Sequence, residues 1–151
     1  MKASRIMTVQ VTCITPDTTL RQAQQLMRQL RVRHLPVVSH GVLCGILSDR
    51  DLLARGTLED GALVVPELPT VQAMTLHPVT CRPGAPVSQL ASLMLEHRID
   101  SLPIVNSRNE LVGLVTSTDL LALLREPEHV TDTLPFSFQL RTADEVLVPA
   151  A

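Results

Sequence analysis

The string HLPVV at residues 34–38 returns as SLPIV at residues 101–105, and GILSDRD at 45–51 returns as GLVTSTD at 113–119. Both belong to a longer repeat, in which residues 7–53 recur as residues 74–121. The offset is 67 residues up to Val38 and 68 after one extra residue in a loop of the second copy. A unit of this size that occurs twice does not suit a solenoid, which needs three or more shorter units. It predicts two similar subdomains packed as a pseudo-dimer, with a duplicated functional site at their contact.

The composition limits the class of protein. A chain of 151 residues with 45% apolar residues is expected to fold as one compact globular unit. The net charge is −2, with basic and acidic residues interspersed, which argues against a nucleic-acid binder that relies on a basic face. Trp and Tyr are absent, and Phe136 and Phe138 lie outside the repeat, so the repeat has no aromatic platform for single-stranded nucleic acid.

Targeting and metal signals are also weak. No apolar run approaches the roughly 18 residues of a membrane span, and the N-terminus turns polar before a signal-peptide core forms, so we expect a cytoplasmic protein that does not enter a membrane. The three cysteines, Cys13, Cys44 and Cys81, form no CxxC motif and have no His at ligand spacing, so no zinc site is expected. Reduced, buried thiols are the favoured interpretation, against an approach of Cys13 to Cys81.

Each copy predicts the same order of elements. An extended segment (9–15, 79–82) leads into an amphipathic helix (20–30, 87–95), whose apolar residues recur every three or four positions. Two short apolar runs around a polar turn then read as a hairpin, and a last helix follows (49–54, 117–124). The unit is therefore β-α-β-β-α. Residues 55–70, rich in Gly and Pro, connect the copies, and residues 71–74 are expected to form a short helix.

The junction between the last strand and the last helix carries the candidate chemistry. Ser48 with Asp51, and Thr116 with Asp119, fit the capping pattern of a helix N-terminus, and either motif alone is a plain helix cap. Recurrence at the same junction favours a functional role. The unpaired N–H groups of a helix start suit a phosphate, and an aspartate there can accept hydrogen bonds from ribose hydroxyls. Phosphate, ribose and an aliphatic slot for a base together define an adenosyl nucleotide.

Over residues 4–125, the repeated unit, the two Leu-Pro strings and the two Gly-x-x-Ser/Thr-x-x-Asp endings resemble a tandem pair of CBS domains, known as a Bateman module. The resemblance implies an α+β fold in which two β-α-β-β-α repeats pack about a pseudo-two-fold axis. The expected boundaries are CBS domain 1 at 4–56, a linker at 57–70, CBS domain 2 at 71–125 and a C-terminal tail at 126–151.

The resemblance also implies the site residues. Asp51 and Asp119 would bind ribose, and hydroxyl and cationic groups near them would reach the phosphates. The residues before each Leu-Pro would serve both their own nucleotide and the base pocket of the other copy. The full set of candidate nucleotide-binding residues is Val9, Val32, Arg33, His34, Ser48, Arg50, Asp51, Leu76, Ile99, Asp100, Ser101, Thr116, Thr118 and Asp119.

The two copies differ at positions expected to face phosphate. Assigning Arg33, His34 and Arg50 to the cleft of Asp51 leads to the hypothesis that this cleft prefers a phosphorylated nucleotide such as AMP or ATP. Asp100, assigned to the cleft of Asp119, would repel phosphate unless Mg²⁺ bridges them. That cleft is then expected to be empty or to take a less charged compound such as S-adenosylmethionine.

The tail lies outside the repeat. Residues 136–140 and 146–148 read as two extended runs, with a loosely packed terminus as the alternative to an added edge strand or an arm across a partner subunit.

No nucleophile–base pair, metal cluster or pair of carboxylates appears, so no enzyme is predicted. We expect a stand-alone regulatory protein that binds an adenosyl nucleotide between the repeats and signals by a conformational or oligomeric change. Its expected partners are a second copy in a homodimer and an unidentified effector protein. The alternative is a structural interaction module of the same fold without a nucleotide, and hydrolysis in the cleft is a weaker third hypothesis, for which no base is found.

Overall fold

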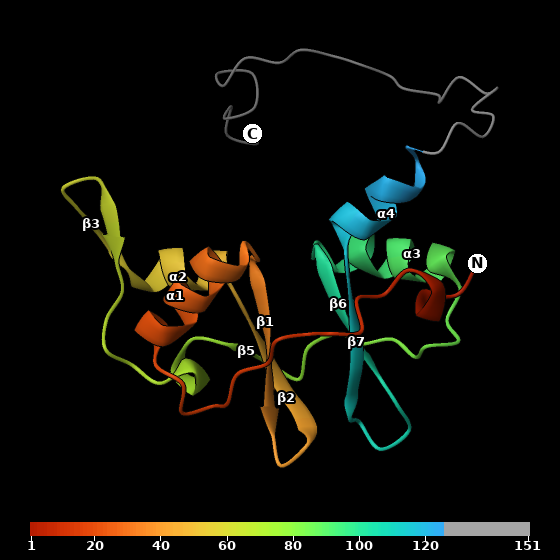
Figure 1. The fold of residues 1–151 in the computed structure, drawn as a ribbon, viewed down its shortest axis with the longest axis horizontal. Coiled ribbons are helices and arrows are strands. Elements are labelled where there is room, and N and C mark those ends of the chain that lie inside the picture. The colour runs from red at the N-terminus through yellow and green to blue at the C-terminus, as the bar shows by residue number, and fades with distance from the viewer. Residues whose placement is uncertain (126–151) are drawn as a thin grey trace, which may run out of the picture.

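A computed structural model describes residues 1–125 and gives each copy a helix, a hairpin and a second helix. In copy one these are α1 (Leu20–Leu30), β1 (His34–Ser39), β2 (Val42–Ser48) and α2 (Asp49–Arg55). In copy two they are α3 (Val87–His97), β6 (Ser101–Val105), β7 (Leu111–Thr116) and α4 (Ser117–Leu123). The two copies lie side by side, and the strands face each other near the centre of the molecule (Figure 1). The α+β fold and the two repeats expected from the sequence are confirmed. The two extended runs expected in the tail lie outside the described residues.

Local sequence signals fix both ends of α1 and the C-terminal end of α3. Thr19 caps α1, because its Oγ1 accepts from the N–H of Gln22 at 3.2 Å while the Gln22 side chain accepts from the N–H of Thr19 at 3.0 Å. Leu20, Ala23 and Met27 form the buried face of α1. Arg31 ends α1, and Arg98 ends α3, each in the left-handed conformation with φ of 54°. The two helices therefore end in the same way, 67 residues apart.

The hairpins of the two copies share their register. β1 pairs antiparallel with β2, and β6 pairs antiparallel with β7. Each pairing shifts at an equivalent point, between Val37 and Val38 and between Ile104 and Val105. The duplication therefore extends to the irregularities of the backbone.

The extended segments expected before α1 and α3 are shorter than predicted. Each is reduced to one parallel bridge, Ile14 to Val37 and Cys81 to Ile104. Pro36 explains the limit in copy one: its C=O accepts from the N–H of Ile14 at 3.0 Å, but a proline has no N–H to continue the ladder on that side. Pro103 does the same in copy two, where its C=O accepts from the N–H of Cys81 at 3.1 Å.

The connector between the copies contains a hairpin that the sequence reading did not predict. β3 (Thr57–Glu59) and β4 (Ala62–Val64) pair around Asp60 and Gly61, which both have positive φ, as a tight hairpin turn requires. The hairpin lies at one end of the molecule in Figure 1, and Leu63 of β4 packs against the core of copy one.

The segments at the start of each repeat, residues 3–13 and 70–80, each pack on the opposite copy. We call them the first leader and the second leader. The short helix η1 (Ala3–Arg5) lies at the start of α3, where the N–H groups of Ala3 and Ser4 donate to the carbonyls of Ala85 and Pro83. The corresponding η2 (Thr70–Gln72) lies at the start of α1, where Thr70 and Val71 donate to Thr18 and Pro16. The expected helix at residues 71–74 is thus a 3₁₀ turn one residue earlier. Each leader is therefore hydrogen-bonded to the turn that precedes the first helix of the other copy.

The leaders then join the sheet of the opposite copy. Thr8 exchanges two backbone hydrogen bonds of 2.9 and 3.0 Å with Leu114 of β7. The short strand β5 (Thr75–Leu76) pairs with Gly45 and Ile46 of β2, which gives the three-stranded sheet β1-β2-β5. The leaders thus connect the two copies through backbone hydrogen bonds in both directions.

Two glycines make this close crossing sterically allowed. A Cβ on Gly113 would lie 2.6 Å from Met7 Sδ and 2.9 Å from Met7 Cγ. A Cβ on Gly45 would lie 2.5 Å from Met74 Sδ and 3.0 Å from the backbone oxygen of Thr75. The repeated methionines and the repeated glycines of the sequence are therefore contact partners across the copies.

The apolar residues form one buried cluster in each copy. The cluster of copy one is centred on Leu20, Leu35 and Leu47, and Ala73 and Met74 from the second leader pack against it. The cluster of copy two includes Ala3 from the first leader, with Ile6 and Met7 packed against it; its other members are Cys81, Leu90, Met94, Leu102, Ile104 and Val115. Each core is therefore completed by residues of the other repeat.

We expect Gly113→Ala to destabilise the protein by about 1–3 kcal/mol, because the added methyl group overpacks against Met7. Urea unfolding measures this change. Gly84→Ala is the matched control, because a Cβ at Gly84 meets nothing within 4 Å. If both variants unfold at the same urea concentration, the glycine is not needed for the crossing.

Candidate functional site

The strand-to-helix junction of copy one is held by a closed set of hydrogen bonds. Oδ2 of Asp51 accepts from the N–H of Ser48 at 2.7 Å and from its Oγ–H at 2.9 Å. The N–H of Asp51 donates back to Ser48 Oγ at 3.2 Å. The expected capping role is therefore present, and it fixes the orientation of the Asp51 carboxylate.

The junction of copy two is built in the same way. Oδ2 of Asp119 accepts from the N–H of Thr116 at 2.7 Å and from its Oγ1–H at 3.0 Å. Within residues 1–125, the second oxygen of each aspartate, Oδ1, makes no hydrogen bond to the protein. Both carboxylates thus use one oxygen for the cap and keep the other as a fixed, unused acceptor.

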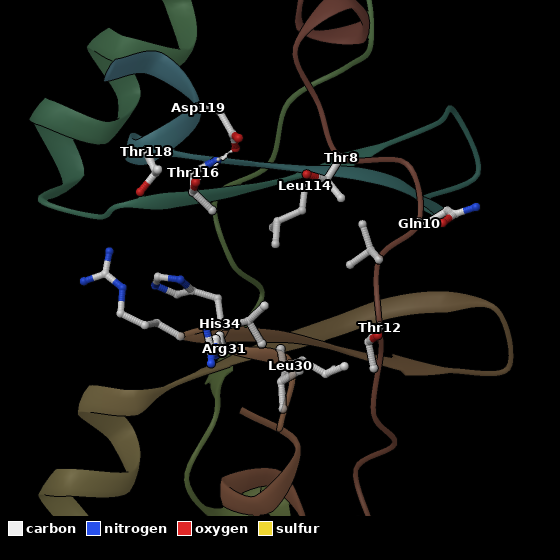
Figure 2. A pocket seen from close by; sticks show the side chains of 14 residues that line it. Thr8, Gln10, Thr12, Leu30, Arg31, His34, Leu114, Thr116, Thr118 and Asp119 are labelled. Atoms are coloured by element: carbon white, nitrogen blue, oxygen red, sulfur yellow. Dashed lines mark hydrogen bonds between the residues drawn. The ribbon is translucent and has the colours of Figure 1, made fainter. Parts of the chain in front are cut away.

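Asp119 opens into a cleft between the two copies, which we call the Asp119 cleft. Its volume is about 450 Å³. Figure 2 shows Thr116, Thr118 and Asp119 of copy two on one wall, with His34 and Leu30 of copy one on the opposite wall. The first leader forms a third side between them (Figure 2). The full lining is residues 8, 10–12, 30–35, 114, 116, 118 and 119.

Asp51 opens into a second, smaller cleft of about 210 Å³, the Asp51 cleft. Its lining is residues 34, 46, 48, 50, 51, 75, 77–79 and 98–101. Apart from His34, each of these positions is the repeat equivalent of a position in the Asp119 cleft, at an offset of 67 or 68. The sequence repeat therefore generates one site twice, as expected.

Most of the candidate residues line these clefts. Val32, Arg33, His34, Thr116, Thr118 and Asp119 line the Asp119 cleft. His34, Ser48, Arg50, Asp51, Ile99, Asp100 and Ser101 line the Asp51 cleft. Val9 and Leu76 line neither one and are 67% and 58% exposed. Their role as base contacts stays a prediction that the lining does not support.

The residues on either side of Val9 and Leu76 line the clefts instead. Thr8 and Gln10 line the Asp119 cleft, and Thr75 and His77 line the Asp51 cleft. The alternation of an extended leader explains this, because neighbouring side chains point in opposite directions. The helix-ending residues Arg31 and Arg98 were also missed, although their equivalence at an offset of 67 is visible in the sequence.

The charges are distributed differently from the sequence hypothesis. Arg33 lines the Asp119 cleft and not the Asp51 cleft, and Asp100 lines the Asp51 cleft and not the Asp119 cleft. Arg33 and Asp100 therefore each line the cleft that contains the aspartate of the other copy. Arg50 and His34 line the Asp51 cleft, where the hypothesis placed them, but His34 lines the Asp119 cleft as well. The expected ranking of the clefts by phosphate preference therefore loses its basis.

A polar contact joins the copies between the two clefts. His34 Nε2 lies 2.9 Å from Asp100 Oδ1, and Arg33 Nη2 lies 3.8 Å from Asp100 Oδ2. The His34 side chain is 8% exposed and that of Asp100 is 28% exposed. This contact is sheltered from solvent, whereas the Arg33 side chain is 54% exposed and its ion pair is weak.

The three cysteines are free thiols: Cys81 is buried, Cys44 is half-buried and Cys13 is exposed. Cys44 Sγ–H donates to the carbonyl of Val37 at 3.3 Å. Desolvation by the surrounding protein, which is only partial at the exposed Cys13, raises the pKa of Cys81, Cys44 and Cys13 above the ordinary thiol value of 9.0. All three are therefore protonated at neutral pH, and a protonated thiol is a poor nucleophile.

Among residues 1–125, no three His, Cys, Asp or Glu side chains come together as metal ligands, and no helix is long and apolar enough to cross a membrane.

The family model for the CBS domain matches twice, at residues 3–56 and 70–126. The CBS domain-containing protein YhcV of Bacillus subtilis is 39% identical over 116 residues, which are 76% of this chain and 79% of that protein. An inosine-5′-monophosphate dehydrogenase of Korarchaeum cryptofilum is 32% identical over 110 residues, 73% of this chain but 21% of the enzyme. The crystal structure of CBSX2 in complex with AMP superposes with a TM-score of 0.69 and 26% identity, covering 82% of this chain and 95% of CBSX2.

We expect all three thiols to react with iodoacetamide more slowly than glutathione at pH 7, and the rates to rise as the pH passes 9, because their raised pKa values keep them protonated. Mass spectrometry of the alkylated peptides measures each rate. The guanidinium-unfolded protein is the control and should react at the rate of free thiols. Fast alkylation of a folded thiol at pH 7 would contradict the raised pKa.

Proposed function

Because the chain belongs to the CBS-domain family and carries two copies of the domain, we propose that it is a regulatory module that binds an adenosyl nucleotide between its repeats. The observation that carries the proposal is the pair of equivalent clefts, each with an aspartate whose Oδ1 is an unused, oriented acceptor. Such an oxygen suits the hydroxyls of a ribose. The complex of CBSX2 with AMP supports a ligand of this class.

The lining of each cleft fits the parts of such a ligand. The hydroxyl group of Thr118, together with the guanidinium groups of Arg31 and Arg33, suits phosphate oxygens in the Asp119 cleft. Val11, Val32 and Leu30 offer an aliphatic surface for a base in the same cleft. AMP, ATP and S-adenosylmethionine are the candidate ligands. We propose no resident metal, and Mg²⁺ would arrive only with the phosphates of a nucleotide.

The proposed signal is a change in the relative orientation of the copies. Each cleft is lined by side chains from both copies and by a leader that passes between them. A ligand that contacts all three favours the arrangement in which they fit it best, which shifts the population toward that arrangement. The match with the dehydrogenase covers only a fifth of that enzyme, so no catalytic activity is carried over.

Self-association through the helices is part of the proposal. Leu53 of α2 and Leu121 of α4 stand at equivalent positions and are 60% and 62% exposed. Leu95 of α3 and Leu124 are also exposed, at 81% and 73%. These leucines offer apolar side chains that a second copy would cover in a homodimer. An effector protein would then recognise the conformation of that dimer.

We expect AMP at 100 times its Kd to stabilise the protein by about 2.7 kcal/mol, and Asp51→Asn/Asp119→Asn to remove this effect. Asparagine keeps the cap, since its Oδ1 still accepts from the N–H of Ser48 or Thr116, but it places an amide donor where ribose needs an acceptor. A thermal-shift assay with AMP, ATP and S-adenosylmethionine measures the effect.

The control is Asp49→Asn, because Asp49 is exposed on the first turn of α2 and lines neither cleft. Asp49→Asn should respond like the unmodified chain. If no adenosyl compound raises the melting temperature of the unmodified protein, nucleotide binding is refuted and the interaction module is favoured.

We expect the protein to elute as a dimer, and Leu53→Lys/Leu121→Lys to give a monomer, because two buried charges would oppose an apolar contact. Light scattering after gel filtration measures the mass. Leu58→Lys is the control, since Leu58 is 73% exposed but belongs to the hairpin β3–β4. A monomer in the unmodified protein, with and without nucleotide, would contradict the homodimer.

A further inference from the structure

One pair of equivalent positions carries opposite charges. Arg33 and Asp100 stand 67 residues apart, each directly before the residue that opens the first hairpin strand of its copy. Arg33 lines the Asp119 cleft, and Asp100 lines the Asp51 cleft. The duplicated site is therefore cationic at this position in one cleft and anionic in the other.

The remaining charges do not cancel this difference. Arg31 and Arg33 face Asp119 in the larger cleft. In the smaller cleft, two arginines face two carboxylates, and the four residues are Arg50, Arg98, Asp51 and Asp100. Formally, the Asp119 cleft carries an excess of one positive charge and the Asp51 cleft is neutral before a ligand enters.

The environment of Asp100 keeps its carboxylate in place. Oδ1 lies 2.9 Å from His34 Nε2, and the side chain is 28% exposed. The ion pair with Arg33 is long, at 3.8 Å, and Arg33 is 54% exposed, so the guanidinium is free to bind an anion in the Asp119 cleft. A phosphate in the Asp51 cleft would instead meet a fixed carboxylate, and like charges in a partly desolvated cleft repel.

We propose that Asp100 and Arg33 determine which adenosyl ligand each cleft accepts: the Asp119 cleft takes a ligand with an anionic phosphate, and the Asp51 cleft takes an adenosyl compound without phosphate. The inference rests on the proposed adenosyl function. The volumes agree with it, because the cleft of about 450 Å³ has more room for a phosphate chain than the cleft of about 210 Å³. Asp100 acts as a specificity residue by excluding phosphate.

Isothermal titration with AMP and adenosine tests this, because the two compounds differ only in the phosphate. For the unmodified protein we expect one AMP site per chain, with a Kd at least about tenfold below that for adenosine at the same site. Asp119→Asn should remove this AMP site. Asp49→Asn should leave it unchanged.

Asp100→Asn is the decisive variant. It keeps the size of the side chain and an acceptor for His34 Nε2, but removes the negative charge. We expect a second AMP site to appear, and Asp51→Asn/Asp100→Asn to lose it again. Arg33→Gln is the reciprocal variant and should raise the Kd of AMP in the Asp119 cleft about tenfold, with little change for adenosine. Circular dichroism melting curves check that each variant is folded.

The inference would be overturned by two AMP sites of equal affinity in the unmodified protein, or by a tight AMP site that Asp51→Asn removes and Asp119→Asn does not. Adenosine binding without any preference for phosphate would also refute it, while leaving the adenosyl function in place. Failure of both compounds, together with ATP and S-adenosylmethionine, would refute the proposed function itself.

Discussion

The structure depends on the crossing of the two leaders. Residues 3–8 pack on copy two before the chain enters copy one, and residues 70–76 pack on copy one before it enters copy two. Hydrogen bonds from Thr8 to Leu114 and from β5 to β2 close both crossings. Gly113 and Gly45 leave the space for Met7 and Met74, because a Cβ at Gly113 would lie 2.6 Å from Met7 Sδ and one at Gly45 would lie 2.5 Å from Met74 Sδ. Each core is thus completed by residues of the other repeat.

The same crossing creates the clefts. After Thr8, the first leader runs back to copy one, where Ile14 pairs with Val37, and the residues between form a side of the Asp119 cleft. The second leader makes the same passage along the Asp51 cleft. A ligand in either cleft would therefore contact both copies and the leader that passes between them. For the proposed regulatory function, this geometry would let a bound ligand favour one arrangement of the two copies without any reaction.

The two-fold symmetry of the scaffold is broken by charge. The scaffold positions are repeated closely: the caps of α2 and α4, the left-handed ends of α1 and α3, and the register shifts of the two hairpins all recur. In contrast, Arg33 and Asp100 differ, and so do His34 and Ser101. His34 is the one side chain that lines both clefts, and its contact with Asp100 connects them. The two clefts are therefore similar in shape and different in chemistry.

The sequence by itself determined the repeat unit, the caps and the two aspartates that line the clefts. These depend on local spacing and on turn chemistry, which act within a few residues. It also indicated that the site is duplicated. It did not show the hairpin β3–β4, and it read the segments before α1 and α3 as strands, where Pro36 and Pro103 allow only single bridges.

Only the tertiary structure decided which copy each side chain serves. Arg33 and Asp100 were expected to serve both the nucleotide of their own copy and the pocket of the other, and each lines only the cleft that contains the aspartate of the other copy. Val9 and Leu76 were expected to line the clefts, and their neighbours do so instead. The physical reason is the exchange of the leaders and the packing of the two hairpins, which are contacts between residues far apart in the chain. A repeat read from sequence gives equivalent positions, but the direction in which a side chain crosses an interface is set only when the copies are packed.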